Sequence, residues 1–160
     1  MAQLRLPDGA TAGFRLDLTG EFGERFTIHI YGARRGGWFI AADTGYFGPA
    51  CSVGPRPLVR GQWRGLLGLV KRAAFWDRPA RWPLDTSTTW DGGGWLTLAG
   101  RNPDRYHEVL TGAGDTYTGR GLSDIARFLS QLSGLAPALR PPLFGLGPGS
   151  APGDAPPAGP

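Results

Sequence analysis

The chain has 160 residues, of which 41% are hydrophobic, and its 17 Lys and Arg residues against 13 Asp and Glu residues give a net charge of +4. This length favours one globular domain, and the composition excludes a collagen-like chain, a coiled coil and a disulfide-stapled miniprotein. No apolar run reaches the ~18 residues of a transmembrane helix, and the N-terminus has no apolar signal segment, so we expect a cytoplasmic protein without membrane contact.

Three strands are predicted in the first quarter of the chain. Apolar residues alternate with polar ones over residues 14–18 and over residues 26–31, which is typical of half-buried strands, and the segment between them fits a hairpin turn. After a turn at residues 34–37, residues 38–41 form the third predicted strand. Residues 43–57 are rich in glycine and proline and are therefore predicted to be a loop.

An amphipathic helix is predicted next, because apolar residues recur with helical spacing between residues 58 and 76. Pro57 suits the first helical position, where a missing N–H costs no hydrogen bond. Pro79 and Pro83 prevent the helix from continuing.

The second half of the chain predicts a short strand at residues 88–90 and a hairpin of two strands at residues 95–98 and 106–110. A closing amphipathic helix follows from Leu122, with Ser123 as its predicted N-cap and Gly134 as its C-terminal stop.

The resulting order, β-β-β-α-(β)-β-β-α, predicts an α+β fold in which two amphipathic helices pack on one face of an antiparallel sheet. Residues 1–135 form this single domain. Residues 136–160 contain eight prolines and five glycines and are predicted to be a disordered tail, because they bury too little apolar surface to offset the entropy of ordering.

One part of the second half is similar to a group of proteins. Asp91, Gly92 and Trp95, with Leu98 beyond them, precede the strand sequence Tyr106-His107-x-Val109 and a leucine-rich helix. This arrangement resembles small uncharacterised bacterial proteins with an Asp-Gly-x-x-Trp-x-Leu strand and a Tyr-His-x-Val strand. The resemblance covers residues 88–135. It implies the strand pair and helix, and it implies no mechanism.

The ionisable residues show no spacing typical of a catalytic or metal site. His107 and Glu108 are neighbours on a predicted strand and point to opposite faces, and His29 lies on the polar face of its strand. Cys51 is interpreted as a small residue beneath a loop, and Asp43 as a turn residue that accepts local backbone hydrogen bonds. We therefore predict no enzyme activity, no metal and no cofactor.

Basic and aromatic residues interleave between residues 60 and 82. Such a stretch binds single-stranded nucleic acid when the rings are exposed for stacking, whereas buried rings leave the arginines as a solvated rim. The candidate binding residues are Arg60, Trp63, Arg64, Lys71, Trp76, Trp82, Trp90 and Trp95.

The aromatic content favours an interaction function. The chain has six Trp, eight Phe and four Tyr residues, and aromatic residues together with arginine anchor protein interfaces. The first hypothesis is a non-enzymatic binding protein, immunity-like or regulatory, that contacts another protein through a sheet face or the segments 43–57 and 76–94. The alternative is a weak single-stranded nucleic-acid binder that uses the stretch 60–82.

Overall fold

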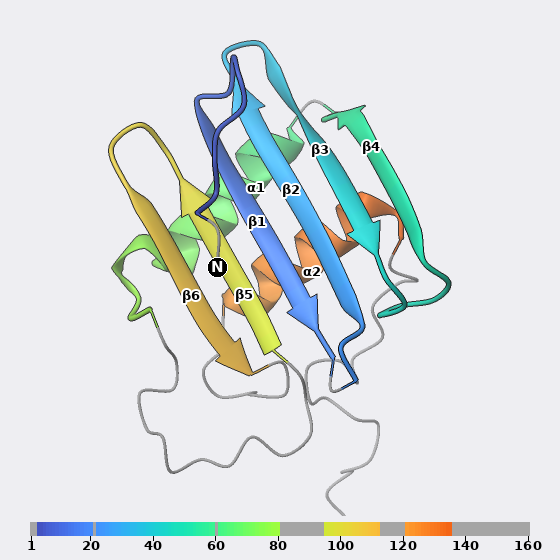
Figure 1. Ribbon diagram of the computed structural model, residues 1–160. Helices are drawn as coiled ribbons and strands as arrows, with labels where there is room; N and C mark the ends of the chain where they lie inside the picture. The colour runs from blue at the N-terminus through green and yellow to red at the C-terminus, as the bar shows by residue number, and fades with distance from the viewer. Residues whose placement is uncertain (1–2, 21, 60, 81–94, 113–120, 136–160) are drawn as a thin grey trace, which may run out of the picture.

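The computed structural model describes residues 3–20, 22–59, 61–80, 95–112 and 121–135 (Figure 1). The predicted tail and the predicted short strand at residues 88–90 lie outside these residues. Among the helices that the structure describes, none combines the length and the apolar character needed to cross a membrane.

Six antiparallel strands form one sheet in the order β4-β3-β2-β1-β5-β6. Along each of the two central strands, β1 and β2, alternate side chains are apolar and buried, so one face of the sheet carries most of the core. The α+β class predicted from the sequence is confirmed. The strands are β1 (Ala12–Thr19), β2 (Arg25–Ala33), β3 (Gly36–Asp43), β4 (Cys51–Pro57), β5 (Trp95–Arg101) and β6 (Tyr106–Gly112).

The prediction of a loop over residues 43–57 is wrong for its second half, because β4 pairs there with β3. β4 is an edge strand, and an edge strand tolerates proline because only one of its sides needs N–H donors. The pairing shifts register between Phe39 and Ala41, opposite Gly54, where a Cβ would lie 2.7 Å from the carbonyl oxygen of Phe39. Glycine and proline in this segment therefore mark an irregular edge strand as well as a turn.

The first helix, α1 (Gln62–Arg72), is shorter than predicted at both ends. Pro57 ends β4 and does not begin the helix, because the backbone first turns through Gly61 at a φ of 94°. At the other end Ala74 takes the left-handed conformation, and a 3-10 turn, η1 (Phe75–Asp77), follows. The apolar pattern that predicted one helix thus covers a helix and a separate turn.

The closing helix, α2 (Leu122–Ser133), begins after Gly121, and no side chain caps its N-terminus, so the prediction of Ser123 as the N-cap is wrong. Gly134 ends the helix with a φ of 69°, as predicted.

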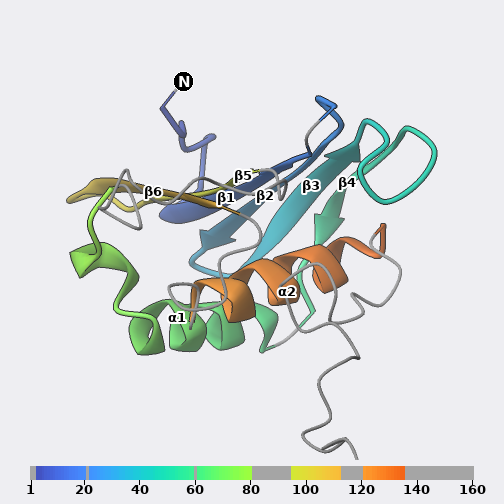
Figure 2. The ribbon, with the colours of Figure 1, turned by 90° about the horizontal axis from the view of Figure 1, so that it is seen from below.

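Both helices lie on the same side of the sheet (Figure 2). The ring of Phe14 on β1 contacts the rings of Trp63 on α1 and of Phe75 and Trp76 in η1. A Cβ on Gly32 of β2 would overlap the indole of Trp63, so the glycine allows the helix side chain to lie directly on the strand. We call this the covered face and the opposite side the open face.

Candidate functional site

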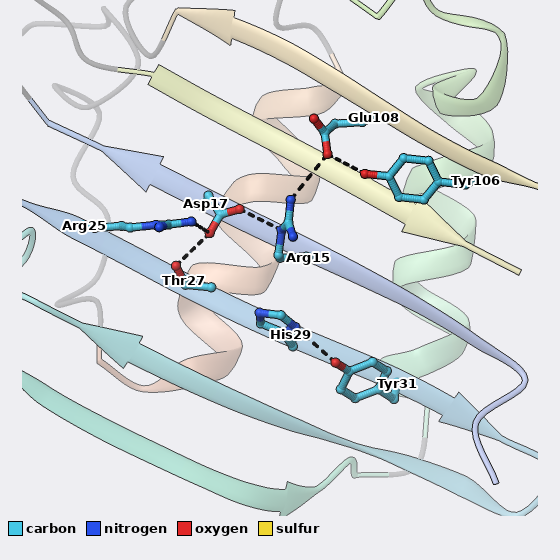
Figure 3. A network of polar contacts seen from close by, with 8 residues as sticks. All are labelled: Arg15, Asp17, Arg25, Thr27, His29, Tyr31, Tyr106 and Glu108. Carbon is cyan, nitrogen blue, oxygen red and sulfur yellow. Dashed lines mark hydrogen bonds and ion pairs between the residues drawn. The ribbon is translucent and has the colours of Figure 1, made fainter. Parts of the chain in front are cut away.

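The open face carries polar side chains at alternate positions of the two central strands (Figure 3). Arg15 and Asp17 lie on β1, where their cross-strand partners on β2 are His29 and Thr27. Because side chains alternate along a strand, these residues point away from the apolar side chains of the covered face. The polar residues between the core residues of each strand thus converge on one surface.

The carboxylate of Asp17 is almost completely buried, at 2% exposure; one of its oxygens accepts hydrogen bonds and the other forms an ion pair. Arg25 Nη2 and the Thr27 hydroxyl each donate to Oδ1 at 2.7 Å, and Arg15 Nε forms an ion pair with Oδ2 at 2.7 Å. A buried carboxylate is tolerated only when it is paired and hydrogen-bonded. Asp17 therefore fixes the positions of two arginines.

The network continues across β5 to β6. Arg15, itself only 8% exposed, places Nη2 3.3 Å from Glu108 Oε2, and the residue between them in the sheet is Ala99, whose small side chain leaves the path open. The hydroxyl of Tyr106 donates to the same carboxylate oxygen. Burial, together with this hydrogen bond and the Glu108 charge, raises the pKa of Tyr106 to about 12, so the hydroxyl keeps its proton.

His29 lies beside this network on β2. Its Nδ1 and the hydroxyl of Tyr31 are hydrogen-bonded at 3.0 Å. Burial lowers the pKa of His29; the charge of Asp17 opposes this effect, and those of Arg15 and Arg25 add to it. The imidazole is therefore neutral at pH 7 and available for hydrogen bonding.

Two hollows flank His29. The larger, of about 900 Å³, lies between the open face and the N-terminal segment, residues 3–10. Leu4 anchors that segment, because it is buried against Tyr31 and Ala99. The smaller hollow, of about 320 Å³, lies on the β3–β4 side and is lined by Ile40, Ala42 and Val53 among others.

The ionisable groups of the open face are held in contacts with one another. Each carboxylate of the network is engaged by an arginine and a hydroxyl. Over the described ranges of the chain, no three His, Cys, Asp or Glu side chains gather closely enough to hold a metal ion. The chemistry that this surface offers is a fixed pattern of donors and charges.

Asp43 and Cys51 are not among the described residues that line either hollow beside His29. Asp43 lies on the covered side, where its carboxylate accepts the N–H groups of residues 45, 46 and 47, as predicted. Cys51 is exposed at the start of β4, so its predicted place beneath a loop is wrong.

His107 and Glu108 point to opposite faces, as their adjacency predicts. His107 contacts the ring of Phe75 on the covered face, with ring centroids 5.1 Å apart, and Glu108 joins the network on the open face. His107 Nε2 is buried and has no hydrogen-bond partner among the described residues. The two ionisable groups therefore cannot act together.

The candidate residues of the stretch 60–82 do not form one patch. Trp63 and Trp76 are half-buried and pack against the core, whereas Arg64 and Lys71 are exposed on α1. Trp95 lies on the opposite side of the sheet, on the open face, at 40% exposure. Arg60, Trp82 and Trp90 lie outside the described residues.

Sequence reasoning missed the charged network of the open face. The signal was the placement of Arg15 and Asp17 between apolar residues of one strand, because charges there must find partners on adjacent strands. The partner Glu108 is 93 residues away, and only the pairing of β1 with β5 and of β5 with β6 brings it close.

Comparison with known proteins adds no relative: no family model matches the chain, and no curated protein matches it.

Proposed function

We propose that the chain is a non-enzymatic binding module that contacts another protein through the open face of its sheet, in an immunity-like or regulatory role. The observation that carries this proposal is the character of that face. Exposed apolar side chains, Ile40 at 39% and Trp95 at 40%, border a buried and prearranged charge network.

This pattern is similar to the anatomy of protein interfaces. Such interfaces are enriched in aromatic residues and arginine, and a few of these residues supply most of the binding energy. Arg25, whose side chain is 50% exposed and paired with Asp17, lies opposite Thr19 in the sheet, and Thr19 lies opposite Trp95. A rigid sheet presents these groups with little loss of side-chain entropy on binding.

Single-stranded nucleic acid has less support as the ligand. Base stacking needs exposed ring faces, but Trp63 and Trp76 contact Phe14 in the core. The exposed residues Arg64 and Lys71 supply charge, but the neighbouring ring of Trp63 is half-buried and contacts Phe14.

The proposal is tested with two matched variants in a pull-down from the source cells. Ile40→Glu places a charge on the open face, and Leu67→Glu places one on α1, where the side chain is equally exposed at 41%. We expect one stoichiometric protein partner that binds the wild type and Leu67→Glu and is lost with Ile40→Glu, while circular dichroism shows all three proteins folded. Absence of a stoichiometric partner, or equal binding by both variants, would reject the proposal.

A further inference from the structure

We propose that the larger hollow of the open face binds a carboxylate of an acidic segment in the protein partner. This inference rests on the proposed function and adds the chemistry of the segment that is recognised. It is carried by the charges that line the hollow and by the way in which the N-terminal segment is held over the sheet.

Among the residues that the structure describes, three arginines line the hollow, Arg5, Arg15 and Arg101, and no aspartate or glutamate does. Arg15 is already paired with Asp17 and Glu108, so it contributes little unbalanced charge. Arg5 and Arg101 form no ion pair with any residue that the structure describes. The positive charge that faces the hollow is therefore left for an external anion.

Arg101 is the main candidate for direct recognition. It is the last residue of β5, and its Nη1 donates to the carbonyl oxygen of Leu4 over a long distance of 3.5 Å. A guanidinium has five N–H donors in one plane, so this weak contact orients the group and leaves donors for a carboxylate. A carboxylate matches that plane with two parallel hydrogen bonds.

The walls of the hollow are fixed before a ligand arrives. Leu4 is buried against the sheet, and a Cβ on Gly13 would lie 2.8 Å from the ring of Tyr31 and 3.1 Å from Leu6, so the glycine lets the N-terminal segment approach. His29 and Tyr31 form a hydrogen-bonded pair on the floor. The half-buried side chain of Leu6, which also lines the hollow, suits the methylene groups of a glutamate side chain.

The lining favours a peptide over a nucleic acid. Tyr31 is the one Phe, Tyr or Trp among the described residues that line the hollow, and it is buried, so it offers no open ring face for stacking a base. The imidazole of His29, which also lines the hollow, is half-buried. A single recessed carboxylate needs one guanidinium and a few hydrogen-bond donors, and Arg101 and His29 supply these within one hollow.

The test uses the full chain and a blocked peptide of alternating glycine and glutamate, with the glycine–glutamine peptide as its neutral match. Binding is followed by NMR, through the backbone amide signals and the imidazole signals of His29. Arg101→Gln and Arg5→Gln remove the charges of the hollow, and Arg64→Gln removes an exposed charge on α1 as the control. Inorganic phosphate and an oligothymidine are titrated in parallel.

We expect the glutamate peptide to shift signals of His29 and of the N-terminal segment, and to bind about tenfold more tightly than the glutamine peptide, the ratio expected for one charge-assisted hydrogen bond. Arg101→Gln should remove about the same factor, Arg5→Gln a smaller one, and Arg64→Gln none. Added salt should weaken the binding.

Four results would overturn the inference: no binding of the glutamate peptide, equal binding of the two peptides, no loss with Arg101→Gln, or tighter binding of phosphate or oligothymidine at the same residues. These failures differ from failure of the binding function. A partner lost with Ile40→Glu and kept with Leu67→Glu would stand even if the glutamate peptide does not bind.

Discussion

The covered face and the open face of the sheet are made from alternate residues of the same strands, but different forces hold them. On the covered face, Phe14 packs against the rings of Trp63, Phe75 and Trp76. On the open face, the next residue of the strand, Arg15, is held between two carboxylates. Apolar packing tolerates many well-fitting side chains, whereas a buried charge is costly unless its partners are kept in place. The core of the fold therefore depends on the covered face, and recognition is the role that we propose for the open face.

The largest expected loss of stability is on the covered face. Phe14→Ala should lower the free energy of unfolding by about 4 kcal/mol, because the lost ring contacts Trp63, Phe75 and Trp76. Its removal leaves a cavity in the core. Urea unfolding followed by tryptophan fluorescence measures the change. Phe22→Ala is the control, because the Phe22 side chain is 93% exposed, and it should change the free energy of unfolding by less than about 0.5 kcal/mol. Similar losses for the two variants would mean that the ring cluster is not a centre of packing.

The next effect tests the open face. Asp17→Ala should cost about 3 kcal/mol, because it leaves the buried Arg15 with only one of its two carboxylates and removes the acceptor of Thr27. The matched control is Asp104→Ala, which removes an exposed carboxylate. Urea unfolding of both variants gives the comparison. A loss for Asp17→Ala no larger than that for Asp104→Ala would show that the network adds nothing to stability.

A third variant tests how closely α1 approaches the sheet. Gly32→Ala should destabilise the protein by about 2 kcal/mol, because the new methyl group overlaps the indole of Trp63 and the helix side chain must move. Gly65→Ala is the control on α1 itself, since its Cβ would meet Phe128 at an ordinary 3.7 Å and alanine favours a helix. Thermal unfolding should therefore place the two variants on opposite sides of the wild type.

The two faces also differ in how far the sequence predicts them. The alternation of Phe14, Leu16 and Leu18 predicts the covered side of β1 correctly, because burial of apolar residues depends on the local period of two. The position of Gly134 predicts the end of α2 for a similar local reason.

The features that the sequence did not predict depend on distant pairing. β4 has the composition of a loop and becomes a strand because β3 offers it an edge. The open-face site depends on Glu108 reaching Arg15 across Ala99, and no local pattern shows that contact. The basic-aromatic stretch 60–82 indicated a binding surface on α1 instead, although Trp63 packs against the core.

The smallest expected effect separates the two faces by pH. Burial lowers the pKa of His29 in the folded protein below its value of about 6.5 in the unfolded chain, so the unfolded chain binds more protons as the pH falls below that value. The free energy of unfolding should therefore decrease as the pH falls from about 7.5 to about 5, and His29→Gln should make this decrease smaller.

Urea unfolding of both proteins at the two pH values measures the difference. The substitution changes only residue 29, so the difference between the two proteins reports on the imidazole of His29. An unchanged pH dependence in His29→Gln would mean that the imidazole is as well solvated in the folded protein as in the unfolded chain. A steeper dependence would mean that the charge of Asp17 outweighs burial, and His29 would then be a cation of the open face rather than a neutral donor.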